Sequence, residues 1–170
     1  MKATARNEGR RPVRRARWVA LVVALLLCLG AGSLGAVWTN LSVATWYADL
    51  QKPTWNPPDW VFGPVWTALY LMMAVAAWLI WLGRGLSEGK VPLALFGVQL
   101  TLNAAWSGLF FGLRSPGLAL IDVILLWSAI VATALSFARV SGWAAGLLLP
   151  YLGWVSFAAV LNGVIWWSNR

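Results

Sequence analysis

Long runs of apolar residues, separated by short polar segments, dominate the chain. We predict five helices over residues of about 18–38, 61–83, 92–112, 117–138 and 144–167. A helix of roughly 20 apolar residues crosses a hydrocarbon core of about 30 Å. The strands of an outer-membrane barrel would alternate polar and apolar side chains, and these runs do not alternate. The pattern therefore predicts an all-α membrane protein, a bundle of five transmembrane helices.

The connection over residues 39–60 is the longest of the polar segments; the others are short, such as the turn over 114–117 (RSPG). Prolines stiffen a loop by fixing φ, and long ordered loops usually serve a function. Two interpretations stay open, an interfacial loop anchored by tryptophans and a loop that covers a ligand. The prolines and tryptophans of this loop are Pro53, Pro57, Pro58, Trp46, Trp55 and Trp60.

Composition agrees with a membrane protein, since the chain is 61% hydrophobic and has a mean hydropathy of +0.73. Charged residues make up 11% of the chain, against roughly 25% in soluble domains. The formal net charge of +8 could suggest nucleic acid, but seven of the thirteen basic residues lie within the first 17. We therefore expect no nucleic-acid partner, and divide the chain into a basic cytoplasmic tail (1–17) and a transmembrane domain (18–170).

The distribution of Lys and Arg predicts the orientation. With the N-terminus inside, ten of the thirteen basic residues lie on the cytoplasmic side and three on the other, as the positive-inside rule requires. The basic tail could also dock on anionic lipid. A prokaryotic plasma membrane is the expected location.

The first apolar run has a second interpretation. A basic start, an apolar run and small residues over 30–36 also resemble a cleavable signal peptide. Residues 18–38 are long enough to span the membrane, so we expect a retained helix and keep cleavage as the alternative. Cys28 is the only cysteine, which excludes an intramolecular disulfide. Leu27 before it is not the small residue that a lipoprotein signal needs.

The 14 tryptophans are too many for an aromatic belt alone. Trp66, Trp106, Trp127 and Trp154 lie inside the predicted spans. Three helix faces mix aromatic side chains with hydrogen-bonding groups and would form an aromatic pocket if they converged. Interhelical packing with the amides as glue is the alternative, and Trp127 lies on none of these faces. The faces are Phe62/Trp66/Tyr70, Gln99/Asn103/Trp106/Phe110 and Tyr151/Trp154/Ala158/Asn162.

Two further patterns lie within the spans. Asp122 is the one ionisable residue well inside a span, which makes it a functional candidate, or an acid that caps or snorkels near the interface. Ala104, Gly108 and Gly112 are four residues apart and permit close contact between helices.

Several residue types and motifs are absent from the sequence, and their absence excludes some classes of function. There is no histidine, which excludes haem ligated through His. No phosphate-binding loop and no nucleophile–base pair is present, and one intramembrane acid supports a proton relay poorly. Asp49 and Asp59 share a loop without an evident acid partner. We expect no metal and no resident cofactor, which leaves binding, passage, or chemistry performed by the ligand itself.

Three motifs resemble the tryptophan-rich sensory protein family, also called translocator protein or peripheral benzodiazepine receptor (TspO/MBR). The first covers residues 46–60 (WYADLQKPTWNPPDW) and continues into 62–70 (FGPVWTALY). The second runs from Gln99 through Trp106 to Gly112, and the third covers 149–162 (LPYLGWVSFAAVLN). The similarity extends from about residue 40 to the C-terminus.

The resemblance implies a five-helix bundle, usually a homodimer, that binds porphyrins such as protoporphyrin IX, sterol-like lipids and benzodiazepine-type ligands. It implies a pocket under the first loop and a dimer contact through the third helix, at Ala104, Gly108 and Gly112. Residues 160–170 lack the tyrosine of a proposed cholesterol motif, which puts sterol binding in doubt. The expected ligand-binding residues, with Phe62 and Tyr70 added from their shared face, are Tyr47, Pro57, Phe62, Trp66, Tyr70, Asn103, Trp106, Trp154 and Ala158.

Three functions follow as hypotheses. The first is a binding protein or carrier for porphyrins with a role in tetrapyrrole or stress regulation. Lacking His, it would prefer metal-free porphyrin or hold haem by its face, with Lys52 or loop N–H groups at the propionates. The second is a light-dependent porphyrin-degrading enzyme that uses Trp66 and Trp154. The third is a ligand-responsive membrane regulator that acts through a partner protein.

Overall fold

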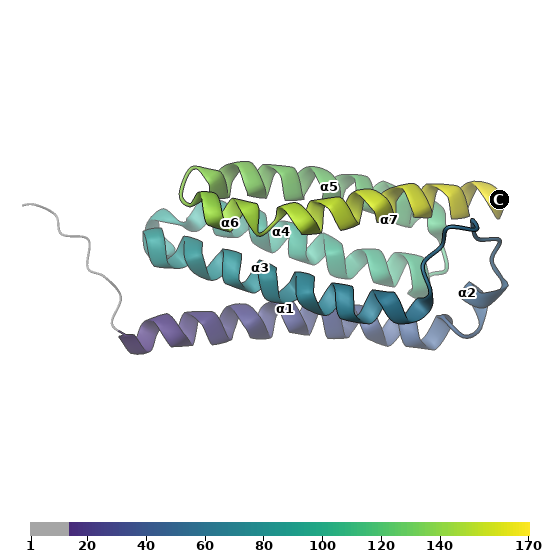
Figure 1. Ribbon diagram of the computed structural model, residues 1–170, viewed down its shortest axis with the longest axis horizontal. Helices are drawn as coiled ribbons and strands as arrows, with labels where there is room; N and C mark the ends of the chain where they lie inside the picture. Colours follow the sequence, from purple (N-terminus) through teal and green to yellow (C-terminus); the bar gives the residue numbers. More distant parts are fainter. Residues whose placement is uncertain (1–13) are drawn as a thin grey trace, which may run out of the picture.

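Five long helical segments lie side by side in a computed structural model that describes residues 14–170, except the side chains of 86–88 (Figure 1). Each segment is long and apolar enough to cross a membrane, which confirms the predicted fold class. The segments are α1 (Arg14–Ser42), α3 (Asp59–Glu88), α4 (Lys90–Ser107) with its π-helical end η1 (Gly108–Gly112), α5 (Pro116–Ala138), and the pair α6 (Gly142–Gly146) and α7 (Leu149–Ser168). A short helix, α2 (Trp46–Asp49), lies in the first loop.

The helix ends differ from the prediction in several places. Helix α1 already includes residues 14–17, which we expected in the basic tail; residues 1–13 lie outside the described part of the chain. The fifth predicted helix is interrupted between α6 and α7, because Pro150 in the first turn of α7 has no N–H to continue the hydrogen bonding. The break predicted over 84–91 is confirmed at Gly85, whose φ of 65° favours glycine.

The third long helix does not end as the regular α-helix that we predicted. Its last turn is π-helical, and the N–H of Leu113 bonds to the carbonyl of Gly108 over 2.7 Å. A π turn places one additional residue in the turn, and such turns are frequent at functional sites. The turn therefore alters the helical register of Phe110 and Phe111 relative to a regular α-helix.

The core lies between α3, α4, α5 and the pair α6 and α7, and α1 adds little to it beyond Cys28. Met73, Ile80 and Ile130 are fully buried, and the Phe96 and Phe137 rings stack at 6.0 Å. In α1 only Cys28, Gly35 and Ser42 are buried. Exposed apolar faces of this kind meet lipid in a membrane protein.

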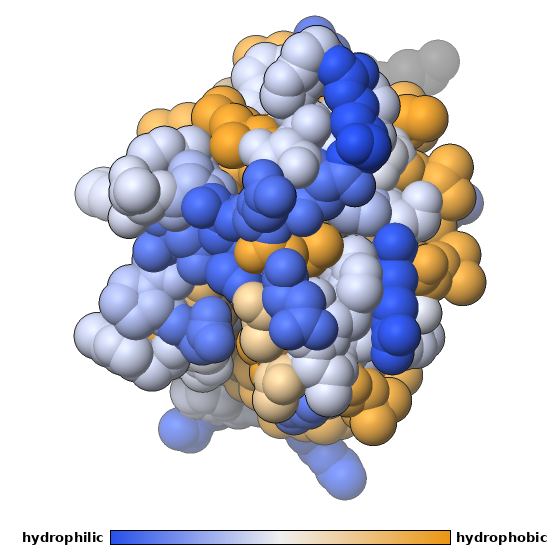
Figure 2. All heavy atoms as spheres, turned by 90° about the vertical axis from the view of Figure 1, so that its right-hand side faces the viewer, coloured by the Kyte–Doolittle hydropathy of each residue, from blue (hydrophilic) through white to orange (hydrophobic). Residues whose placement is uncertain are grey.

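The first loop is fixed to the opposite end of the chain. The backbone N–H of Gln51 donates to Asn169 Oδ1, and Asn169 Nδ2 donates to the Gln51 carbonyl, both over 2.9 Å. The loop and the C-terminus therefore share one end of the bundle (Figure 1). Seen end-on, this face gathers polar side chains across its centre and apolar ones along its flanks (Figure 2). We call it the loop end.

Candidate ligand-binding cavity

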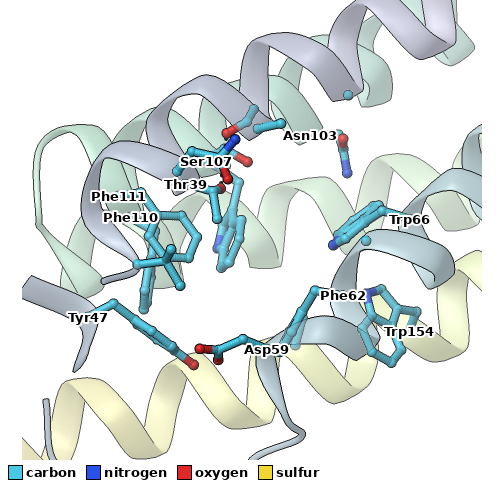
Figure 3. A pocket seen from close by; sticks show the side chains of 18 of the residues that line it. Thr39, Tyr47, Asp59, Phe62, Trp66, Asn103, Ser107, Phe110, Phe111 and Trp154 are labelled. Carbon is cyan, nitrogen blue, oxygen red and sulfur yellow. Dashed lines mark hydrogen bonds between the residues drawn. The ribbon is translucent and has the colours of Figure 1, made fainter. Parts of the chain in front are cut away.

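A cavity of about 830 Å³ lies beneath the first loop, between α1, α3, α4 with η1, and α7 (Figure 3). Small-molecule sites measure roughly 300–1,000 Å³, so the volume suits a ligand of substantial size. Its wall is mainly apolar and aromatic. The helix faces that the sequence predicted to converge do meet here, although only in part.

Eight of the nine residues expected from the sequence line this cavity, and Pro57 does not. The carbonyl of Pro57 accepts a hydrogen bond from Asn56 Nδ2 (3.0 Å), and Asn56 Oδ1 accepts one from the Tyr47 hydroxyl (3.1 Å). Pro57 therefore shapes the loop behind Tyr47. The eight lining residues are Tyr47, Phe62, Trp66, Tyr70, Asn103, Trp106, Trp154 and Ala158.

One aromatic wall is built by α3 and α7. The rings of Trp66 and Tyr70 stack at 5.6 Å between centroids with 29° between their planes. Phe62 meets Trp154 edge-on at 5.8 Å. Helical spacing of four residues explains the first pair, because residues i and i+4 are neighbours on one face.

The opposite wall is built by α4, η1 and α2 (Figure 3). Trp106 stacks on Phe110 at 5.1 Å with 21° between the planes, and Phe110 meets Phe111 at 4.9 Å. Tyr47 lies against Phe111 at 5.5 Å. Flat aromatic ligands stack favourably on such rings, so the two walls together suit a planar guest.

Two buried amides fix the walls. Asn103 Oδ1 accepts the hydroxyl proton of Tyr70. Asn162 Oδ1 accepts from Trp106 Nε1 over 3.1 Å, and its Nδ2 donates to the carbonyl of Pro116 over 2.8 Å. Buried polar groups in a membrane protein are expected to face protein or a cavity in this way.

The deeper ends of the predicted faces lie outside the cavity. Gln99 is fully buried, with its Nε2 3.9 Å from Met73 Sδ. Tyr151 is fully buried behind Trp66, whose ring it meets at 6.2 Å. Both earlier interpretations therefore hold in part. The α3 face lines the cavity along its whole length, whereas the α4 and α7 faces line it at one end and pack between helices at the other.

Sequence reasoning missed the contribution of α1. Small residues at i, i+3 and i+4 spacing let the neighbouring helices approach, and we interpreted this stretch only as a feature of signal peptides. The ring of Tyr70 lies where a side chain at Gly32 would be, and the Ser107 hydroxyl lies 2.8 Å from the ideal Cβ position of Gly35. The α1 residues in the wall are Leu29, Gly32, Ser33, Gly35, Ala36, Thr39 and Asn40.

The cavity opens sideways between α1 and α3. All of its lining residues on α4, η1 and α7 are buried or half-buried, whereas the exposed ones lie on α1 and α3. Their spacing places them along two facing stripes, which we call the α1–α3 seam. The hydroxyls of Ser33 and Thr67 donate to carbonyls of their own helices at 2.9 Å. The seam residues are Leu29, Ser33, Ala36 and Asn40 on α1, and Trp60, Gly63 and Thr67 on α3. The remaining exposed wall residue, Asp59, is the first residue of α3 and lies at the loop end.

The row of small residues on the third long helix meets another part of the same chain. An ideal Cβ at Gly112 would lie 3.0 Å from Trp38 Cδ1, and one at Gly108 would lie 3.7 Å from the same indole. Ala104 is half-buried. Close contact between helices is therefore present between η1 and α1, and the dimer contact stays a prediction.

Trp127, Asp122 and Lys52 do not line the cavity. Trp127 is exposed and donates to the Ser156 hydroxyl over 2.9 Å. Asp122 is buried, with Oδ2 lacking a hydrogen-bond partner among the described residues. The Lys52 ammonium donates to the carbonyls of Tyr47 (2.6 Å) and Ala48 (3.0 Å). Among the side chains that the structure describes, no group of three His, Cys, Asp or Glu residues could hold a metal.

Comparison with known proteins agrees with the three motifs. The model of the TspO/MBR family matches residues 24–167. The chain belongs to the TspO/MBR family. Among its relatives, the tryptophan-rich protein TspO of Chlorobaculum tepidum is 48% identical over 148 residues, 86% of this chain and 94% of the relative.

Members from distant organisms are also similar. The translocator protein of Bos taurus is 45% identical over 155 residues, 90% of this chain and 92% of the relative. The tryptophan-rich sensory protein of Cereibacter sphaeroides is 36% identical over 145 residues, 85% of this chain and 88% of the relative. The TspO/MBR match and the five apolar helices establish the chain as a membrane protein of this family.

Proposed function

We propose that this TspO/MBR protein is a membrane binding protein or carrier for porphyrins and related flat hydrophobic ligands, with a role in tetrapyrrole or stress regulation. One observation carries the proposal. Two aromatic walls, with Trp66 and Trp154 on one side and Trp106 and Phe110 on the other, flank a cavity of about 830 Å³. A porphyrin is a large planar π-system, and stacking on such walls stabilises it without a covalent link.

The ligand is best described as a metal-free porphyrin or a haem held by its face. The chain has no histidine to ligate haem iron. The porphyrin is cargo, and no resident cofactor is proposed. Sterol-like lipids are secondary candidates because the seam would admit an apolar molecule.

The proposed carrier spans a prokaryotic plasma membrane as a homodimer with its N-terminus in the cytoplasm. The charge distribution supports this orientation. The loop end would then face away from the cytoplasm. The seam would give the cavity direct access to lipid, from which a hydrophobic ligand can partition.

Titration of the intrinsic fluorescence with protoporphyrin IX in the dark tests binding. We expect saturable quenching, weakened in Trp66→Phe and Trp154→Phe and unaffected in Trp127→Phe, since Trp127 lies outside the cavity. Unsaturable quenching that is equal in all four proteins would overturn the proposal, because it would report partitioning into micelles.

A second candidate is light-dependent oxidation of the bound porphyrin, with dioxygen as the oxidant. It is favoured by the position of Trp66 and Trp154, which are both in the cavity wall. Illumination of the complex should then bleach the porphyrin absorbance faster in the wild type than in Trp66→Phe or Trp154→Phe. Equal bleaching rates in the wild type and both variants would exclude a role of these tryptophans in the oxidation and leave binding as the supported function.

A further inference from the structure

Asp59 stands out because it is the one charged side chain in the cavity wall, within the described part of the chain. It is the first residue of α3 and follows Pro57 and Pro58 in the loop. Its carboxylate lies at the edge of the cavity, between Tyr47 and Phe62 (Figure 3). The negative charge of Asp59 contributes to raising the pKa of the Tyr47 phenol, after the larger effect of burial.

No described cation neutralises this carboxylate. Lys52 is the basic residue of the first loop, and its ammonium binds the carbonyls of Tyr47 and Ala48 and lies 4.6 Å from the Tyr47 ring centroid. Arg170 lies over the Trp167 ring, 3.2 Å from its centroid, and is not part of the cavity wall. The exposed Asp59 carboxylate therefore has no ion-pair partner among the described residues and is the charge that a ligand meets at the loop end of the cavity.

The cavity wall offers a ligand carboxylate no cation. Its remaining polar groups are hydroxyls, amides and indole N–H groups, and several are already engaged. Thr39 donates to the Gly35 carbonyl (3.0 Å), Asn103 accepts from Tyr70, and the amide of Asn162 forms two hydrogen bonds. Moving a carboxylate out of water without a cation is strongly unfavourable. We therefore expect a bound ligand to place any carboxylate near water, at the loop end or in the seam.

We propose that Asp59 is a specificity-determining residue that selects against ligands with free carboxylates at the loop end. The cavity then prefers tetrapyrroles whose loop-side edge is neutral or cationic, such as a carboxyl ester, over the free dicarboxylic acid. This inference rests on the proposed function, because it names the chemical subclass of porphyrin that the same cavity takes. An Asp at a helix N-terminus also stabilises the helix, and the experiment must separate that role from selection.

The test compares protoporphyrin IX with its dimethyl ester, which has the same macrocycle and lacks both negative charges. Affinities are measured by fluorescence titration of the full chain in uncharged detergent micelles. The variants are Asp59→Asn, which keeps the size of the side chain, and Asp49→Asn as the matched control. Asp49 is an exposed acid of α2 at the same end of the molecule and does not line the cavity.

We expect Asp59→Asn to tighten binding of the free acid about three- to tenfold at low salt and to leave the ester within about twofold. In the wild type, about 0.5 M salt should recover most of this gain by screening. Asp49→Asn should change neither affinity. Unchanged binding of the ester also shows that Asp59→Asn is folded. If Asp59 served only to stabilise the helix, the substitution would weaken binding of the ester and of the free acid alike.

Two results would overturn the inference. One is equal affinity of the free acid for the wild type and Asp59→Asn while the ester still binds. The other is an equal gain in Asp49→Asn, which would assign the effect to overall charge. Failure of both porphyrins to bind any variant would instead refute the proposed function, on which this inference rests.

Discussion

Replacing Asn162 by leucine removes an amide that joins three helices in the wall of the cavity. The side chain is 1% exposed and comes from α7. It accepts the Trp106 indole proton from α4 at 3.1 Å and donates to the Pro116 carbonyl at the start of α5 at 2.8 Å. Leucine is of similar size, so the perturbation removes hydrogen bonds and leaves little new cavity.

The expected cost follows from these two bonds. Interhelical hydrogen bonds in membrane proteins are worth about 0.6 kcal/mol on average and about 1.7 kcal/mol at most, so two of them contribute about 1.2 kcal/mol. A second measure of the same loss is the indole N–H of Trp106, because a buried donor left without a partner costs about 1–3 kcal/mol. The two figures describe the same bonds and are not added. We expect Asn162→Leu to lower the free energy of unfolding by about 1–3 kcal/mol.

Unfolding in mixed micelles of increasing dodecyl sulfate content, followed by circular dichroism, measures this change. Thr101→Val is the control, because the exposed Thr101 hydroxyl bonds only to the Gly97 carbonyl of its own helix. In a double-mutant cycle, Trp106→Phe should cost less in the Asn162→Leu background than in the wild type. A loss below about 0.5 kcal/mol for Asn162→Leu, or additive costs in the cycle, would refute the reasoning.

Three further predictions concern the seam, the α1–α3 contact and the loop. Gly63→Phe should slow porphyrin uptake and release severalfold in stopped-flow fluorescence with little change in affinity, because an ideal Cβ there meets nothing within 4 Å and the ring would cover the seam. Gly32→Ala should lower the free energy of unfolding in the same mixed micelles by about 1–3 kcal/mol, since its methyl group would overlap the Tyr70 ring. The Tyr47 phenol should ionise above pH 10 in ultraviolet absorbance, because burial and the Asp59 charge raise its pKa from 10.0. The raised pKa contributes to the free energy of unfolding; this contribution is fully present below pH 10 and is lost as the pH rises through the raised pKa.

Matched controls exist for the two glycine variants. Gly153 and Gly30 are exposed, lie outside the cavity wall, and have ideal Cβ positions with nothing within 4 Å. Gly153→Phe should therefore leave the ligand kinetics unchanged, and Gly30→Ala should leave stability unchanged. Rates in Gly63→Phe that equal those of Gly153→Phe would exclude access through the seam. A phenolate of Tyr47 that forms at or below pH 10 would contradict the burial argument.

The helices were predictable because long apolar runs report membrane burial directly. The interruptions within them were harder to predict. The π turn over 108–112 uses residues that fit an α-helix equally well, and it lies where Gly112 packs closely against Trp38, a contact between distant parts of the chain. Pro150 does indicate a break before α7, but it lies within a long apolar run that we interpreted as one continuous helix.

The site was predictable where aromatic residues recur at helical spacing, as at Trp66 and Tyr70. The contribution of α1 was not, since glycine and alanine form the wall by allowing close approach and carry no chemical signature of their own. Pro57 was expected in the wall from its motif, but Asn56 and Tyr47 stand between the loop backbone and the cavity. The proposal for Asp59 required knowing that the Lys52 ammonium is bound to the carbonyls of Tyr47 and Ala48 and does not line the cavity.

The proposed function requires a porphyrin to occupy the cavity between the two aromatic walls. Measuring the affinity of Ala158→Phe and Ala68→Phe for protoporphyrin dimethyl ester tests this occupancy. Ala158 lines the cavity, whereas Ala68 is an exposed residue of α3 outside it. Ala158→Phe, which fills the cavity, should weaken binding at least about tenfold, equivalent to about 1.4 kcal/mol, and Ala68→Phe should bind as the wild type does. Equal, saturable binding by both variants would place the porphyrin outside this cavity.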